Sequence, residues 1–122
     1  MEVQRIAADA RPTLEAFLAD IGLHRAGAPL DCRQLLDPFS HWVDAQPVVE
    51  ADRFYLASRL AAFICEYLIE ACSGQRIIEH GRIKMLVPIQ QGFQREFDPY
   101  LVAIAMATNR TSLKAFLEAV ME

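Results

Sequence analysis

The chain has 122 residues, a mass of 13.7 kDa and a formal net charge of −4. Hydrophobic residues make up 53% of it, which excludes intrinsic disorder, because disordered chains are poor in apolar residues and rich in charge. A chain of this length fits one domain, so we expect residues 1–122 to share a single core. Lysine and arginine occur only as isolated residues, whereas nucleic-acid binding needs a basic patch, so no nucleic-acid partner is expected.

Two helices are predicted before the middle of the chain. Apolar residues at helical spacing predict the first helix over residues 12–21, with Gly22 in the position that follows a helix end. Asp37 and Pro38 are the residue types preferred at an N-cap and at the first helical position, so a second helix is expected to begin there. Asp31 is expected to cap only a short turn before it.

A third, central helix is predicted from residues 50–52 to Ser73, with Gly74 as its stop signal. Its polar residues form a narrow stripe, so we expect neighbouring elements to surround it on most sides. Three charged side chains interrupt its apolar sequence: Arg59, Glu66 and Glu70. Because a charge at the centre of a membrane span is costly, the segment is interpreted as a buried helix, and no membrane partner is expected.

After Gly74 the apolar residues alternate with polar ones, which predicts strands over residues 75–79 and 82–89. His80 and Gly81 between them suit a two-residue hairpin turn, since both tolerate positive φ. This turn sets the expected cross-strand pairs: Glu79 with Arg82, Ile78 with Ile83, and Ile77 with Lys84. One face of the sheet is then apolar and the other is charged.

The rest of the chain predicts one more strand and two helices. Gly92 fits the left-handed position of a turn that leads into a strand over residues 93–97. Asp98 and Pro99 begin an apolar helix, and residues 112–121 form the last helix. The predicted fold is therefore α+β, with three N-terminal helices including a long buried central one, a three-stranded antiparallel meander and two C-terminal helices.

The cysteines indicate a reducing compartment. Cys32, Cys65 and Cys72 are odd in number, and the last two lie seven residues apart on one predicted helix. That spacing separates them by about 10 Å, beyond the roughly 7 Å that a disulfide allows. The N-terminal residues lack the apolar stretch of a secretory signal. We therefore expect reduced, buried thiols in a cytoplasmic protein.

A first candidate site lies on the central helix. Glu66 and Glu70 are one helical turn apart, and paired carboxylates can support acid–base chemistry or bind a ligand with Arg59 nearby. The alternative is a polar helix edge that faces solvent or pairs with arginine. Four-helix carboxylate metal sites use Glu-x-x-His, which does not occur here. No catalytic residue, metal ion or cofactor is assigned.

A second candidate site is the charged face of the predicted sheet. Arg76, Arg82 and Lys84 are placed on this face together with Glu79, where they would bind a protein partner. A short third strand also leaves a sheet edge that a partner strand could extend. The alternative is that the surface is merely solvated.

The favoured function is that of a small intracellular, non-catalytic protein–protein interaction module, such as an adaptor, a chaperone-like protein or an inhibitor. Two nearly apolar helices need more covering surface than the remaining helices provide, so a homodimer formed through an apolar helical face is expected. The alternative is a small enzyme or ligand-binding protein that uses Arg59, Glu66 and Glu70 beside the central helix.

Overall fold

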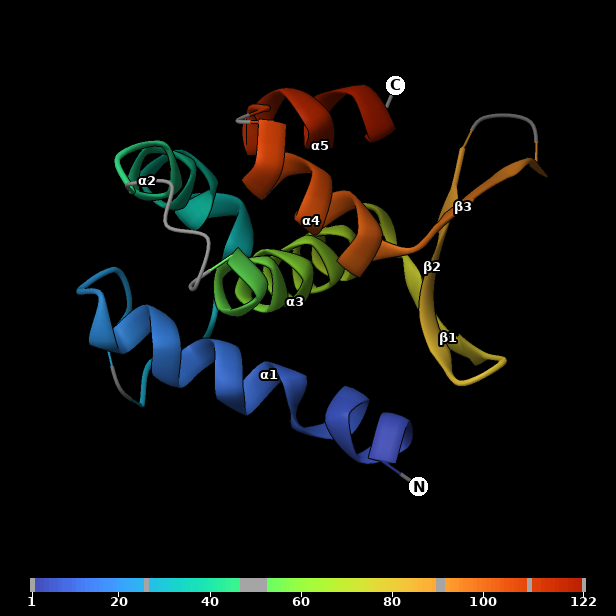
Figure 1. Cartoon of the computed structure of the whole chain (residues 1–122), viewed down its shortest axis with the longest axis horizontal. Coiled ribbons are helices and arrows are strands. Elements are labelled where there is room, and N and C mark those ends of the chain that lie inside the picture. Colours follow the sequence, from blue (N-terminus) through green and yellow to red (C-terminus); the bar gives the residue numbers. More distant parts are fainter. Residues whose placement is uncertain (1, 26, 47–52, 90–91, 110, 122) are drawn as a thin grey trace.

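The computed structural model describes residues 2–25, 27–46, 53–89, 92–109 and 111–121. It confirms the α+β fold: three helices are followed by a three-stranded antiparallel sheet and two further helices. In Figure 1, α3 runs through the middle of the molecule, α1 lies along one side, α4 and α5 lie on the other, and the sheet extends from one end. The elements are α1 Glu2–Asp20, α2 Cys32–Asp44, α3 Arg53–Cys72, β1 Gln75–Glu79, β2 Arg82–Pro88, β3 Gln94–Phe97, α4 Pro99–Asn109 and α5 Leu113–Met121.

The first helix is longer than the sequence predicted. It begins at Glu2, ten residues before the expected start, and Pro12 lies inside it. The added segment is rich in alanine and other good helix formers, which continue the helix despite the hydrogen bond that Pro12 cannot donate. The predicted end is confirmed: Gly22 has a φ of 81°, and the Leu23 N–H bonds to the Leu18 carbonyl at 2.9 Å.

The second helix also begins earlier than predicted. Asp31 is its N-cap and accepts a hydrogen bond from the Gln34 N–H at 3.2 Å, so the expected short turn is the first turn of α2. Asp37 and Pro38 lie within the helix, and the predicted start at these residues is wrong. Of two adjacent capping signals, the first prevails because its helix buries Leu36 on the same face as the residues that follow.

The central helix is confirmed as one continuous element, and its core residues Leu60, Phe63 and Leu68 are fully buried. The expected start at residues 50–52 lies outside the described residues. The first turn is less covered than predicted, since Phe54 is 62% exposed and Tyr55 is 54% exposed.

A tight junction joins α3 to β1. The left-handed residue after the helix is Ser73, with a φ of 59°, and the Gly74 N–H bonds to the Leu68 carbonyl at 2.9 Å. A Cβ on Gly74 would lie 3.1 Å from that carbonyl and 3.1 Å from the Met85 methyl group. Glycine is therefore required here for close packing, while the unusual backbone conformation falls on the serine.

The sheet has the predicted register. Glu79 pairs with Arg82 across the hairpin, and His80 and Gly81 have φ values of 52° and 75°, as a two-residue turn requires. Pro88 ends β2, where the hydrogen bond that it cannot donate is not needed. Gly92 is left-handed with a φ of 80°, although residues 90–91 of the predicted turn lie outside the described residues.

The last two helices begin as predicted, and both are capped by side chains. Asp98 Oδ1 accepts hydrogen bonds from the N–H groups of Tyr100 at 2.9 Å and Leu101 at 3.1 Å. Ser112 Oγ accepts one from the Ala115 N–H at 3.2 Å. None of the described helices combines the length and apolar character needed to span a membrane.

The core is built around α3, where aromatic rings from three helices meet. Phe39 of α2 lies 4.4 Å from Phe63 of α3 between ring centroids, and Phe17 of α1 packs edge-on against Trp42 at 5.5 Å. At the sheet end, Met85 and Val87 of β2 are fully buried against the helices. The other sheet face carries Glu79, Arg82, Lys84 and Glu96, which the register places together.

Candidate functional site

Glu66 is buried in the middle of three elements, with only 3% of its surface exposed. Its Oε2 accepts a hydrogen bond from Arg11 of α1 at 2.9 Å, and its Oε1 lies 3.4 Å from Nη2 of Arg76 on β1. A buried carboxylate without a partner would be strongly unfavourable, and the two guanidinium groups compensate for the lost hydration. Glu66 therefore fastens α1 and β1 to α3.

Glu70, one turn further along α3, binds backbone N–H groups instead of arginine side chains. Its Oε2 accepts a hydrogen bond from the Cys32 N–H at 3.0 Å, and its Oε1 lies 3.5 Å from the Arg33 nitrogen. These are the first N–H groups of α2, where a negative charge is favourable. Glu66 thus binds α1 and β1, whereas Glu70 binds the start of α2, so the two glutamates have no partner in common.

Arg59 is a residue of α3 whose side chain lies near Phe17 of α1. Its guanidinium carbon is 4.5 Å from the Tyr55 ring centroid and 5.7 Å from that of Phe17, so it interacts with both aromatic rings. Its Nη1 lies 3.4 Å from Ser58 Oγ. No described contact joins Arg59 to either Glu66 or Glu70, so the structure does not bring the predicted trio together.

The predicted basic surface of the sheet divides between the two faces. Arg76 pairs with Met85 in the register and therefore lies on the inner, helix-covered face, so its placement beside Lys84 on the exposed face is wrong. The alternation of side chains along a strand already implies this placement. Arg76 is two residues from Ile78, so both side chains lie on the apolar, inner face. A binding role for these residues stays a prediction.

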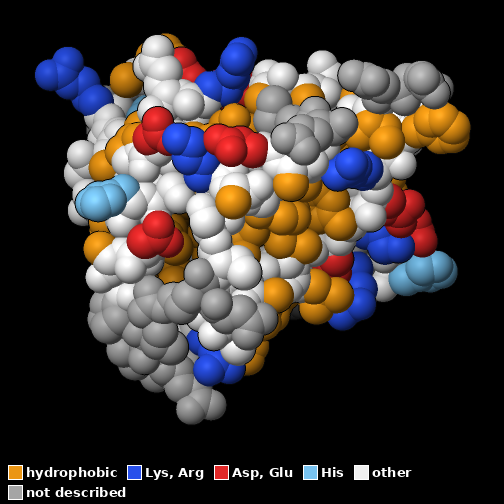
Figure 2. Space-filling model, turned by 90° about the horizontal axis from the view of Figure 1, so that it is seen from above, with side chains coloured by type: hydrophobic (Ala, Val, Ile, Leu, Met, Phe, Trp, Pro, Cys, Tyr) orange, Lys and Arg blue, Asp and Glu red, His pale blue; other side chains and the backbone are white. Residues whose placement is uncertain are grey.

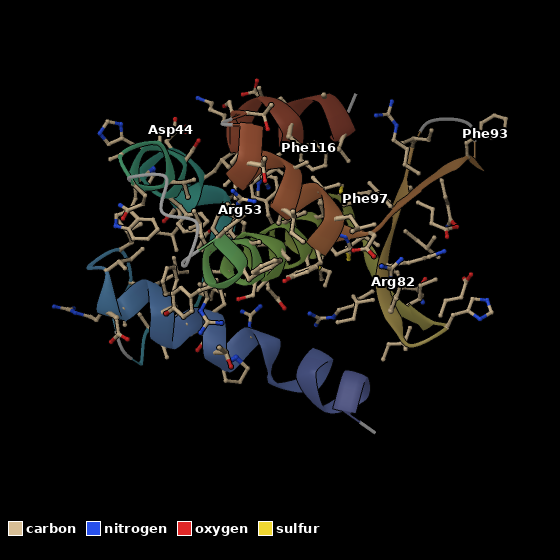
Figure 3. The ribbon with its side chains drawn as sticks, viewed as in Figure 1. Asp44, Arg53, Arg82, Phe93, Phe97 and Phe116 are labelled. Atoms are coloured by element: carbon tan, nitrogen blue, oxygen red, sulfur yellow. The ribbon has the colours of Figure 1, made fainter. Side chains whose placement is uncertain are left out.

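The other two basic residues of this set have separate partners. Lys84 Nζ lies 2.9 Å from Glu96 and 3.3 Å from Glu79, so one ammonium group bridges the strands on either side. The hydrogen bonds that Lys84 donates to Glu96 and then to Glu79 raise the pKa of its ammonium group. Arg82 is 63% exposed and reaches toward the start of α4, with its Nε 3.9 Å from Asp98 Oδ2 (Figure 3).

The most apolar surface belongs to α4. None of its eleven residues is charged, and its outward face carries Leu101, Ala105 and Thr108 at helical spacing. Leu101 is 49% exposed and the neighbouring Tyr100 is 39% exposed. Figure 2 shows hydrophobic side chains gathered in the middle of this side of the molecule, with charged side chains around them. We call this surface the α4 face.

A hollow of about 480 Å³ adjoins the α4 face, between α4 and α5. Val102 and Ala105 form one wall, while Ala115 and Phe116 form the other. Phe116 is held from below by an edge-on contact with Phe97 of β3, whose ring centroid is 5.7 Å away (Figure 3). The protruding Leu101 and this hollow therefore lie side by side on one uncharged surface.

The cysteines are free, and their surroundings make them unreactive. Burial raises the pKa of Cys32 and of Cys65 to about 12, so both thiols stay protonated at neutral pH. Cys72 is partly buried, and its Sγ lies 3.2 Å from the Leu68 carbonyl. Neither buried thiol has the lowered pKa that a nucleophilic cysteine needs.

Within the described residues, no group of three or more histidine, cysteine, aspartate or glutamate side chains is arranged to hold a metal ion. No protein-family model matches the chain, and neither a curated protein nor a solved structure is significantly similar to it. Function must therefore be argued from the surfaces described above. The sequence does not reveal the role of Arg11. It lies 55 residues from its partner Glu66, and no motif around Arg11 indicates that the two side chains meet.

Proposed function

We propose that the protein is a non-catalytic, cytoplasmic interaction module that works as a homodimer formed through the α4 face. The observation that carries the proposal is an exposed helix face without a single charge in a small acidic protein. Apolar surfaces of this kind, bordered by polar residues, are typical of sites where proteins associate. The three free cysteines support a cytoplasmic location, where thiols stay reduced.

The shape of the α4 face favours a second copy as the partner. A two-fold interface brings the same surface of both subunits together, so that surface must be complementary to itself. Here a projection, Leu101, stands beside a hollow lined by Val102 and Ala105. In a two-fold arrangement the Leu101 side chain of each subunit enters the hollow of the other. Because each copy carries a net charge of −4, an uncharged surface is also where two copies repel least.

Sedimentation velocity over about 1 to 100 μM, a range around common homodimer affinities, tests the proposal. We expect the wild-type protein to approach twice its 13.7 kDa mass as concentration rises. Leu101→Glu should remain monomeric, since each subunit would place a carboxylate in the apolar contact. Glutamate suits the first turn of a helix, so this change leaves α4 intact.

Phe93→Glu is the matched control, because it makes the same change of charge at a side chain that is 64% exposed. Phe93 lies at the far end of β3, away from α4 (Figure 3). We expect this variant to dimerise like the wild-type protein. A wild-type monomer at every concentration, or equal losses in the two variants, would contradict the proposal. Ala105→Glu provides a second variant on the α4 face.

A further inference from the structure

A second hollow, of about 460 Å³, lies on the other flank of α4, between α3 and the β1–β2 hairpin. It owes its existence to small residues at helical spacing on α3: Ser58, Ala61, Ala62 and Cys65. Opposite them, Gly81 contributes no side chain at the hairpin turn. Its size falls within the range of roughly 300–1,000 Å³ that is usual for small-molecule pockets.

The walls of this hollow are apolar, and its charges lie on few residues. Ile83, Pro99 and the alanines of α3 line it, and the half-exposed ring of Tyr100 borders it. Only three of its lining residues carry charge, namely Arg76, Arg82 and Asp98. Two guanidinium groups against one carboxylate give the lining an excess of one positive charge. A ligand with an apolar body and one negative group would match it.

The two arginines have hydrogen-bonding capacity left for such a group. A guanidinium group carries five N–H donors. Arg82 approaches Asp98 only to 3.9 Å, and the other oxygen of Asp98 already accepts two N–H groups of α4. Arg76 lies 3.4 Å from Glu66, whose shorter bond goes to Arg11. Each arginine has one described carboxylate neighbour, and that pairing leaves most of its five N–H donors for a further group.

We infer that this hollow binds a small molecule that has an apolar body and a single carboxylate group. The carboxylate pairs with Arg82 and Arg76 at the mouth, where guanidinium donors match its two oxygens. The apolar body lies against Ala61, Ala62 and Ile83. This site lies on the other flank of α4 and shares only Tyr100 with the α4 face, so the inference goes beyond the proposed dimer and does not depend on it.

Titration with sodium octanoate, followed by amide chemical shifts in two-dimensional ¹H–¹⁵N NMR, tests the inference. We expect the shifts to concentrate in residues 58–65, 81–83 and 98–100. Octanamide has the same chain without the charge and should bind at least about tenfold more weakly, because it loses a charge-assisted hydrogen bond. Shifts centred on the α4 face, or equal affinity for the amide, would overturn the inference.

Variants locate the site within the fold. Arg82→Gln should weaken octanoate binding about tenfold, as expected for the loss of a charge-assisted bond. The matched control is Lys84→Gln, which removes the same charge two residues further along β2 from a side chain that does not line the hollow, and should leave binding unchanged. Ala62→Leu should abolish binding by filling the hollow. If Arg82→Gln and Lys84→Gln weakened binding equally, attraction by net charge alone would explain the result and the site assignment would be wrong.

Sedimentation separates this test from that of the dimer. Leu101→Glu should bind octanoate like the wild-type protein, and Arg82→Gln should dimerise like it. A loss of octanoate binding in Leu101→Glu would show that the ligand occupies the α4 face, and the inference would fail.

Discussion

The two long sides of α3 differ in the side chains that cover them. Toward α1 and α2 the helix is sealed by interlocking aromatic rings and by a buried carboxylate that two arginines hold. Toward α4 it presents small residues and an uncharged neighbour, and two hollows flank that neighbour. The large buried side chains on the first side stabilise the fold, and the two hollows beside α4 leave surface for other molecules.

The largest effect is expected where a large apolar side chain is fully buried. Leu18 of α1 is fully buried against α3, so Leu18→Ala should lower the free energy of unfolding by about 3 kcal/mol, through lost apolar contact and a remaining cavity. Urea denaturation followed by circular dichroism measures this. A loss below about 1 kcal/mol would show that the α1 side is not the rigid half of the molecule.

The buried carboxylate should come next. Glu66→Gln removes the charge that pairs with Arg11 and Arg76, and should lower the free energy of unfolding by about 2 kcal/mol, less than for fully buried pairs because both arginines can reach solvent. Glu70→Gln, one turn away, is the control. Glutamine can still accept the Cys32 N–H, so this change should cost only about 0.5 kcal/mol. Equal losses would contradict the different roles assigned to the two residues.

The labelling rates of the two buried thiols, Cys32 and Cys65, provide a kinetic comparison of the two sides of α3. Burial raises the pKa of both Cys32 and Cys65 to about 12, so both are protonated thiols and their labelling requires the surrounding structure to open. Cys65 lines the hollow between α3 and the β1–β2 hairpin. It should react about tenfold faster than Cys32 with a disulfide reagent at pH 8, because a smaller part of the fold must open to expose its thiol. Mass spectrometry of the labelled peptides identifies the site. Faster labelling of Cys32 would reverse the comparison.

The smallest effect on stability is expected on the α4 face. Leu101 is 49% exposed, so Leu101→Ala should change the free energy of unfolding of the monomer by at most about 0.5 kcal/mol. The measurement is made at submicromolar concentration, where dimerisation does not contribute. A loss as large as that of Leu18→Ala would mean that Leu101 belongs to the core.

The register of β1 with β2 could be predicted residue by residue, because its signals are local. His80 and Gly81 fix the turn, and the turn fixes the pairing of these two strands. The start of α2 could not be predicted in the same way, since Asp31 and Asp37 both carry capping signals. The choice between them depends on which helix length buries more apolar surface, and that depends on α1 and α3.

The candidate sites were harder to predict, because they depend on contacts between distant segments. Glu66 stands out in the sequence as a charge on an apolar helix, but its partner Arg11 comes from an element whose first half the sequence does not predict to be helical. Arg59 is engaged by rings rather than by a carboxylate. The hollow between α3 and the β1–β2 hairpin exists because small residues of α3 leave space there. The sequence shows that these residues are small, but not that the hairpin lies opposite them.

The two-residue connection between α3 and β1 has a mechanical consequence. Ser73 and Gly74 leave no slack between the helix and the hairpin, and the Gly74 N–H is bonded back to the Leu68 carbonyl. The two walls of the hollow between α3 and the hairpin are therefore joined at one end by a short, hydrogen-bonded connection. We expect this connection to limit how far the hairpin can move away from α3, so that a ligand of the hollow would be selected by its size.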